Sequence, residues 1–268
     1  MVLRRYGQGP ALLLIHGFPL HGFTWRKLLP ELSRHFTCHV VDLAGKGDSE
    51  WNTDTDFGFD AHARRLRQMI GEIGLNEYSL LGHDTGGTVA RRLALAYPHG
   101  IRRLALINTE IPNHRPPWIP FYGYLFRLPG VAFALRYPFS LRAFVRSPMG
   151  LGGCFHDLRA LEGEFHEHFL APAIHSPRRM EGLVKYLLGI NWGVVDALAV
   201  GHQQLTMPTL LIWGEDDPTF PISRAKELLQ QLPNCHGLVP IPRTKLFPHE
   251  ERPEAVLSPL LKFLSAGD

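Results

Sequence analysis

The chain has 268 residues, 45% of them apolar, and its 28 basic and 25 acidic residues leave a formal net charge of only +3. This length and apolar content allow one large buried core or two small ones. The basic residues alternate with acidic ones, which argues against the concentrated basic face of a nucleic-acid-binding protein.

The cysteines and the apolar runs indicate the compartment. Cys38, Cys154 and Cys235 lie far apart and form no C-x-x-C pair, as is typical of free thiols in a reducing compartment. The apolar run near the N-terminus is too short for a signal peptide, and no run reaches the roughly 20 residues of a membrane span. We therefore expect a soluble, cytoplasmic protein without nucleic-acid or membrane partners, and leave a homodimer open.

Strands and helices are expected to alternate through the first part of the chain. Short apolar runs ended by glycine or polar residues predict buried strands at 11–17, 36–42, 78–84 and 101–110. Apolar residues at helical spacing predict helices at 24–35, 59–74 and 86–98. This order predicts an α/β fold, with a mostly parallel sheet and helices on both of its faces.

The pattern changes in the middle of the chain, where proline, aromatic residues and histidine become frequent and the apolar spacing is helical. Residues 111–202 are therefore expected to form a helical insertion, and 1–110 together with 203–268 a core domain. Alternation then resumes, with strands predicted at 208–214 and 235–242 and helices at 222–233 and 252–264.

Residues 80–87, "LLGHDTGG", predict a tight turn between a strand and a helix. Gly82, Asp84 and Gly86 fit the Gly-x-nucleophile-x-Gly pattern of an elbow that holds its central side chain clear of the sheet. The alternative is that Asp84 only caps the following helix, a position that aspartate favours. The strand before it and the helix after it favour the elbow.

The segment "HGFP", residues 16–19, follows the first buried strand. A nucleophile on an elbow needs backbone N–H donors directed at a developing oxyanion, one from the residue after it and one from such a loop. The N–H groups of Phe18 and Thr85 are the candidate oxyanion hole. Taken alone, "HGFP" is also compatible with an ordinary turn at the end of a strand.

The motifs "HGFP", "VVDLAGKGDS", "GHDTGG", "WGEDDP" and "PHEERPE" occur in the order seen in the α/β-hydrolase fold family, which the chain resembles over nearly its whole length. Asp84 at the elbow resembles the subset that contains epoxide hydrolases and haloalkane or haloacid dehalogenases. The resemblance implies that residues 111–202 are a cap domain and that no cofactor or metal is needed. A carboxylate can displace a leaving group at an sp³ carbon and form an alkyl ester with the enzyme.

The same resemblance implies an acid and a histidine that activate water against this ester. It places the acid at Asp217 in "WGEDDP", but the position of the histidine holds Leu246, and leucine cannot accept a proton. His249 is the nearest substitute, since three extended residues span about 10 Å. His249 is therefore the candidate base, and the alternative is a surface residue before the last helix.

The substrate is expected to be an apolar epoxide of bulky or aromatic character. Dehalogenases of this kind have Trp or Arg after the nucleophile and Asn after the first His-Gly, whereas this chain has Thr85 and Phe18. Epoxide hydrolases use cap tyrosines as proton donors; the chain offers Tyr122 and Tyr124 and, as preferred candidates, Tyr137 and Tyr186. Aromatic packing is the ordinary alternative for each tyrosine.

Two other functions stay open. One is a hydrolase similar to haloalkane dehalogenases, and the other is a non-hydrolytic ligand-binding relative, suggested by Leu246 at the histidine position. His166 and His168 suggest metal only superficially, because residues two apart do not share a helix face.

Overall fold

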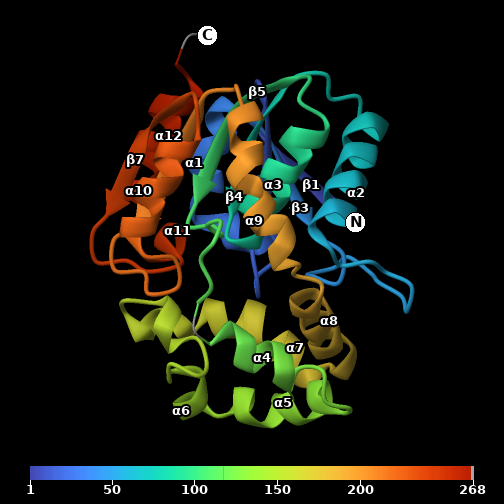
Figure 1. Ribbon diagram of the computed structural model, residues 1–268. Coiled ribbons are helices and arrows are strands. Elements are labelled where there is room, and N and C mark those ends of the chain that lie inside the picture. Colours follow the sequence, from blue (N-terminus) through green and yellow to red (C-terminus); the bar gives the residue numbers. More distant parts are fainter. Residues whose placement is uncertain (117, 267–268) are drawn as a thin grey trace.

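A seven-stranded sheet forms the centre of the computed structural model, which describes residues 1–116 and 118–266 (Figure 1). The strand order is β1-β3-β2-β4-β5-β6-β7, and only β1 is antiparallel to its neighbour. This confirms the mostly parallel α/β fold. The strands are β1 (Val2–Tyr6), β2 (Ala11–Ile15), β3 (Thr37–Asp42), β4 (Tyr78–His83), β5 (Ile101–Ile107), β6 (Thr209–Gly214) and β7 (Cys235–Ile241).

Helices cover both faces of the sheet because its strands are apolar on both sides. In β2, Leu13 and Ile15 join one core cluster and Leu12 and Leu14 the other, as expected from side chains that alternate along a strand. The first cluster includes residues of α2 (Phe59–Glu72), α3 (Thr85–Ala96) and α10 (Ile222–Gln231). The second includes residues of α1 (Leu29–His35) and α12 (Pro253–Leu264).

The structure differs from the expected elements in two places. Residues 24–35, expected as one helix, form the 3₁₀ helix η1 (Gly22–Lys27) followed by α1, where Pro30 lies in the first turn. The edge strand β1 was not expected. It is only half buried and contains two arginines, so it lacks the continuous apolar run that identifies the inner strands.

Between β5 and β6 the chain is helical, and we call residues 111–202 the cap. Helices α4 to α8 gather at one end of the molecule, away from the C-terminus, whereas α9 runs back beside α3 (Figure 1). The cap helices are α4 (Ile119–Leu125), α5 (Val131–Ser140), α6 (Arg142–Val145), η2 (Gly152–Cys154), η3 (Leu158–Leu161), η4 (His166–Leu170), α7 (Ala171–His175), α8 (Pro177–Leu188) and α9 (Trp192–Gly201). Helix η5 (His202–Gln204) lies at the end of the cap, and α11 (Pro248–Glu251) precedes α12.

Among the described residues, no single helix is long and apolar enough to cross a membrane. The helix Pro177–Leu188 and the stretch Trp192–Gln204, bent by 48° to each other, meet the length and composition criteria only as a pair.

The turn between β4 and α3 leaves no room for a side chain at Gly86. A Cβ atom there would lie 2.3 Å from the carbonyl oxygen of His16 and 2.4 Å from that of Ile15. We expect Gly86→Ala to lower the free energy of unfolding by about 3 kcal/mol, the upper range for overpacking, as measured by urea denaturation. Gly71→Ala in α2 is the control. Its Cβ meets nothing within 4 Å, so we expect it to be neutral or slightly stabilising. Equal effects of the two substitutions would contradict the close packing at the turn.

Candidate active site

Asp84 lies at the junction of β4 and α3 in a strained backbone conformation, with φ 51° and ψ −130°. Its side chain makes no capping hydrogen bond to α3. Instead, Oδ2 accepts a hydrogen bond of 2.7 Å from the Phe18 N–H, and the carboxyl group lines a cavity. This geometry fits an elbow and not a helix cap.

The cavity lies between the elbow and the cap and encloses about 160 Å³. Its wall is mostly apolar and aromatic, with polar side chains at Asp84, Thr85, Glu110 and Thr219. An engineered apolar cavity of roughly 150 Å³ holds one benzene molecule. The cavity therefore suits a compact apolar or aromatic molecule, with one charged wall.

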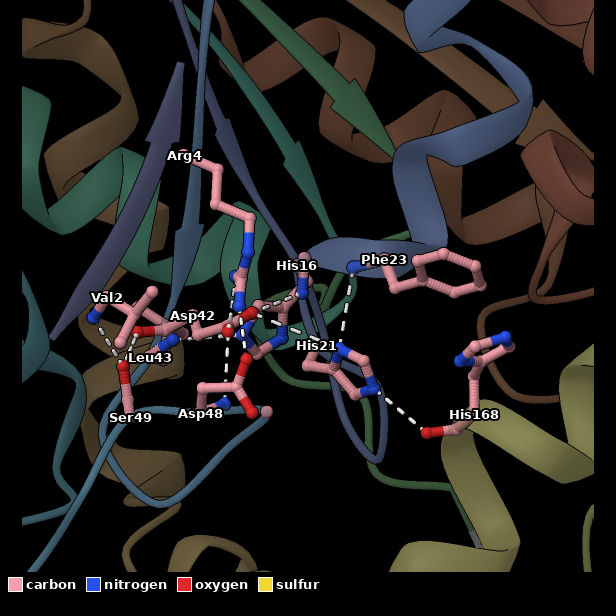
Figure 2. Close-up of polar contacts among 12 residues, drawn as sticks. Val2, Arg4, His16, His21, Phe23, Asp42, Leu43, Asp48, Ser49 and His168 are labelled. Atoms are coloured by element: carbon pink, nitrogen blue, oxygen red, sulfur yellow. Dashed lines mark hydrogen bonds and ion pairs between the residues drawn. The ribbon is translucent and has the colours of Figure 1, made fainter. Parts of the chain in front are cut away.

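A polar network centred on Asp42 holds the loop that contains Phe18 (Figure 2). Asp42 lies at the end of β3, where Oδ1 accepts from the Gly22 N–H at 2.7 Å and Oδ2 accepts from Arg4 at 2.8 Å. Its main-chain oxygen accepts from the Ser49 hydroxyl at 2.6 Å. The loops after β2 and β3 are thus both hydrogen-bonded to Asp42.

His16 stabilises the same loop in a defined tautomer. The Leu43 N–H donates to Nε2 at 3.0 Å, so Nδ1 carries the proton and donates to the Gly17 oxygen at 3.0 Å (Figure 2). Burial lowers the pKa of His16 to about 4, which keeps the ring neutral. Five residues further along, the ring of His21 contacts the cap, with Nε2 3.0 Å from the main-chain oxygen of His168.

The pKa of Asp84 is raised well above its usual value, chiefly by burial and next by the charge of Glu110. The N–H groups of Thr85 and Phe18 oppose this shift, because they stabilise the charged form. Phe18 and Thr85, the residues of the predicted oxyanion hole, are therefore both directed at this carboxyl group.

Glu110 shares the cavity wall with Asp84 and follows β5. Its Oε2 accepts from the hydroxyls of Thr88 at 2.6 Å and Thr109 at 3.2 Å, and the main-chain N–H of Glu110 itself also stabilises the charged form. Burial raises the pKa of Glu110. Glu110 was not among the candidate site residues expected from the sequence, because its partner Thr88 is distant along the chain.

Arg91 holds Glu110 and the two threonines that contact its carboxylate. It is fully buried, and its NH2 group donates to Thr88 Oγ1, Thr109 Oγ1 and the Glu110 main-chain oxygen at 2.8 to 2.9 Å. The positive charge of Arg91 lowers the pKa of Glu110 against the effect of burial. The second carboxylate is thus fixed in position by residues of α3.

Asp217 is buried after β6 and has no histidine partner among the described residues. Oδ2 accepts from Asn108 Nδ2 at 2.7 Å, and Oδ1 accepts from the Thr219 N–H at 2.8 Å. Burial raises the pKa of Asp217 to about 7. The carboxyl group thereby orders the loop whose Thr219 and Phe220 reach the cavity.

His249 does not belong to the described cavity wall, whereas Leu246 does. The Thr24 hydroxyl donates to Glu250, so His249 Nε2, 2.8 Å away, donates to Thr24, and Nδ1 is left without a partner. The ring packs against Trp25 and, at 4.5 Å between centroids, against His83. The imidazole is therefore buried behind the elbow and not beside the cavity.

The cap tyrosines divide between the cavity and the surface. Tyr137 is 73% exposed, and Tyr124 is exposed as well. Tyr186 is buried with its hydroxyl 3.0 Å from Thr85 Oγ1, next to the elbow, but it is not part of the cavity wall. Tyr122 lines the cavity, and its hydroxyl donates to the Met149 main-chain oxygen.

Lys46, in the "GKGDS" turn, lies against the aromatic rings of Phe18 and Tyr186. Its buried amine is 4.5 Å from the ring centroids of both Phe18 and Tyr186 and has no hydrogen-bond partner within the described chain. Burial lowers the pKa of Lys46 well below its usual value, against the attraction of Asp84. The amine holds the two rings that lie next to the elbow.

The structure thus brings together Asp84, Phe18, Thr85 and Tyr186, and it leaves Asp217 close by without an imidazole. It separates His249 and Tyr137 from the cavity. Within residues 1–116 and 118–266, no group of three or more His, Cys, Asp or Glu side chains is arranged to hold a metal ion.

Comparisons with known proteins agree with this architecture. Epoxide hydrolase 3 of Xenopus tropicalis is 26% identical over 270 residues, which cover 96% of this chain and 72% of that protein. Haloalkane dehalogenase 2 of Mycobacterium tuberculosis is 28% identical over 261 residues, which cover 96% of this chain and 88% of that protein. A crystal structure of an α/β hydrolase fold protein from Burkholderia ambifaria superposes with a TM-score of 0.83 at 22% identity, over 97% of this chain and 93% of that one. Residues 10–253 match the model of the α/β hydrolase fold family, and the chain belongs to that family.

Proposed function

We propose that the protein is a cofactor-free hydrolase that opens epoxides of compact apolar or aromatic molecules through a covalent ester on Asp84. The observation that carries the proposal is a strained, buried carboxylate that faces an apolar cavity and accepts the Phe18 N–H. Family membership and the resemblance to a named epoxide hydrolase support it.

In the first step an Asp84 oxygen attacks an epoxide carbon, and the bond between that carbon and the ring oxygen breaks. The ring oxygen leaves with the electron pair and takes a proton. Of the cap tyrosines considered from the sequence, Tyr122 is the one that lines the cavity, and it is our candidate donor in place of Tyr137 and Tyr186. To donate to the ring oxygen, its hydroxyl has to give up its hydrogen bond to the Met149 oxygen. The product is a hydroxyalkyl ester of Asp84.

In the second step water attacks the carbonyl carbon of this ester, while the Phe18 and Thr85 N–H groups stabilise the oxyanion. The step needs a base beside Asp84. We assign it to Glu110, because this carboxylate shares the cavity wall with Asp84, whereas His249 lies behind the elbow. Collapse of the oxyanion releases the diol and regenerates Asp84.

Halide displacement is the second candidate. The indole rings of Trp118 and Trp192 line the cavity, and an indole N–H could hold a leaving halide. Against it, the residues flanking the elbow, Phe18 and Thr85, have no side-chain N–H group. Release of halide from simple haloalkanes at a rate above that of epoxide opening would favour this reading.

A single turnover in heavy-oxygen water tests the ester mechanism. The attacking water oxygen ends up in the Asp84 carboxylate, so we expect the label in the peptide that contains Asp84 and unlabelled diol after one turnover. Mass spectrometry of the digested protein and of the product measures both. Label in the diol with none in the peptide would show direct attack of water on the substrate.

The rate of the first step should depend on the ionisation of Asp84. Only the carboxylate attacks, and burial and Glu110 raise the pKa of Asp84, so the reactive form is lost as the pH falls through this raised pKa. We expect the rate of ester formation, measured by rapid mixing, to rise with pH and then level off. The midpoint of this rise should lie well above the pKa of an ordinary carboxyl group. A rate that stays constant down to about pH 5 would contradict the raised pKa.

A further inference from the structure

Large apolar side chains are exposed mainly in one part of the molecule. Seven of the twelve that are exposed in the described chain lie between residues 121 and 149. Single exposed apolar residues are normal, but a concentration of them marks an interaction site. The seven, which we call the outer cap face, are Phe121, Tyr124, Leu128, Phe133, Tyr137, Leu141 and Met149.

Helix α5 is apolar on both of its sides. Leu135 and Phe139 point inward and line the cavity, while Phe133 and Tyr137, one turn apart on the opposite side, are 69% and 73% exposed. A helix that is apolar all round is usually buried in protein or in lipid. We therefore expect another molecule to bury the outer side of α5.

The charge of this segment indicates what covers it. Residues 118–149 contain four arginines and no aspartate or glutamate. Arg142 and Arg146 form ion pairs with Glu162, at 2.6 and 2.5 Å, but within the described residues Arg127 and Arg136 have no acidic partner. Arg136 donates to the main-chain oxygens of Ile174 and His175, so its positive charge is not neutralised. Aromatic and aliphatic side chains beside arginines without acidic partners are the composition of a surface that binds anionic lipid.

A second copy of the chain fits this face less well. A twofold contact places the same patch against itself, so the arginines of one copy would face those of the other. A bilayer with anionic headgroups accepts the arginines at its surface and the aromatic rings just below. Charge complementarity therefore favours lipid.

One residue of the outer cap face, Met149, also lines the cavity. Tyr122 and Phe126 line the cavity, and their neighbours Phe121 and Tyr124 are exposed outside. The C-terminus lies at the opposite end of the molecule (Figure 1).

We infer that the outer cap face lies on the surface of an anionic lipid bilayer, with its apolar side chains at the boundary between headgroups and acyl chains. This differs from the expectation of no membrane partner, which rested on the lack of a spanning segment. The inference is independent of the chemistry at Asp84.

Flotation of the full-length protein with vesicles tests it. We expect binding to vesicles of phosphatidylcholine with phosphatidylglycerol, and weaker binding to phosphatidylcholine alone or in high salt. The double variant Phe133→Ser/Tyr137→Ser should reduce the partition coefficient at least tenfold, and Arg127→Glu about tenfold on anionic vesicles. Val200→Ser is the matched control, because Val200 is 75% exposed but lies on α9, away from the arginines, and its binding should equal that of the unaltered chain.

Three results would overturn the inference. The first is a lack of binding to either kind of vesicle. The second is binding that the double variant and Val200→Ser weaken equally. The third is a dimer in solution, dispersed by the double variant, with no vesicle binding, which would identify a second copy as the cover. Arg127→Glu keeps the test valid if the double variant fails to fold.

Discussion

Replacement of Asp84 by asparagine is expected to reduce turnover by at least about 10⁴-fold, since the loss of a covalent nucleophile has effects of this size or more. Asparagine tolerates the positive φ of 51° at this position, and its shape is nearly that of aspartate, so the fold should be retained. The unaltered protein, mixed briefly with an epoxide such as styrene oxide and quenched in acid, should gain the mass of the whole epoxide, and the variant should gain none.

Asp54→Asn is the matched control, because Asp54 is an exposed aspartate in a loop. It should retain the full rate and the mass increase. An adduct that forms equally well on the Asp84 variant would place the nucleophile elsewhere, and a turnover that persists without adduct would exclude covalent catalysis.

Glu110→Gln is expected to have the second largest effect, a loss of about 10² to 10⁴-fold in steady-state turnover, the range for removal of a general base. The first step does not need this base, so the ester on Asp84 should accumulate and be seen as a lasting mass increase. The variant also removes a negative charge that raises the pKa of Asp84, so the acid limb of ester formation should move to lower pH.

His249→Gln distinguishes the two candidate bases. Its side chain is bonded to Thr24 and lies outside the cavity wall, so we expect turnover close to that of the unaltered protein, with no accumulated ester. If instead His249→Gln accumulates the ester and Glu110→Gln does not, the base predicted from the sequence is the correct one.

Much of the fold could be predicted from the sequence because the inner strands and the flanking helices have strong local patterns. The run at 11–15 is buried on both sides, and "GHDTGG" specifies a turn that only glycine-flanked residues can form. The edge strand β1 has no such pattern, because two of its five residues are arginines. Its position depends on pairing with β3, which is distant in the sequence.

The arrangement around the cavity could be predicted only in part. The path of the chain after β7 is set by contacts with other elements: the Leu246 N–H donates to the Cys154 oxygen, and His249 bonds to Thr24. Sequence spacing allows His249 to reach the elbow, but these contacts direct its imidazole ring behind the elbow, away from the cavity. Glu110 gains its position from Thr88 and Arg91, and neither contact has a sequence signature.

One contact links the cap to the loop that contains Phe18. His21 is in the loop that holds the Phe18 amide, and its ring meets the main-chain oxygen of His168 in η4 (Figure 2). A movement of η4 away from the core domain would break this contact, while Asp42 and His16 continue to hold the loop. The Phe18 amide therefore owes its direction to the core domain, and the cap contributes one further restraint through His168.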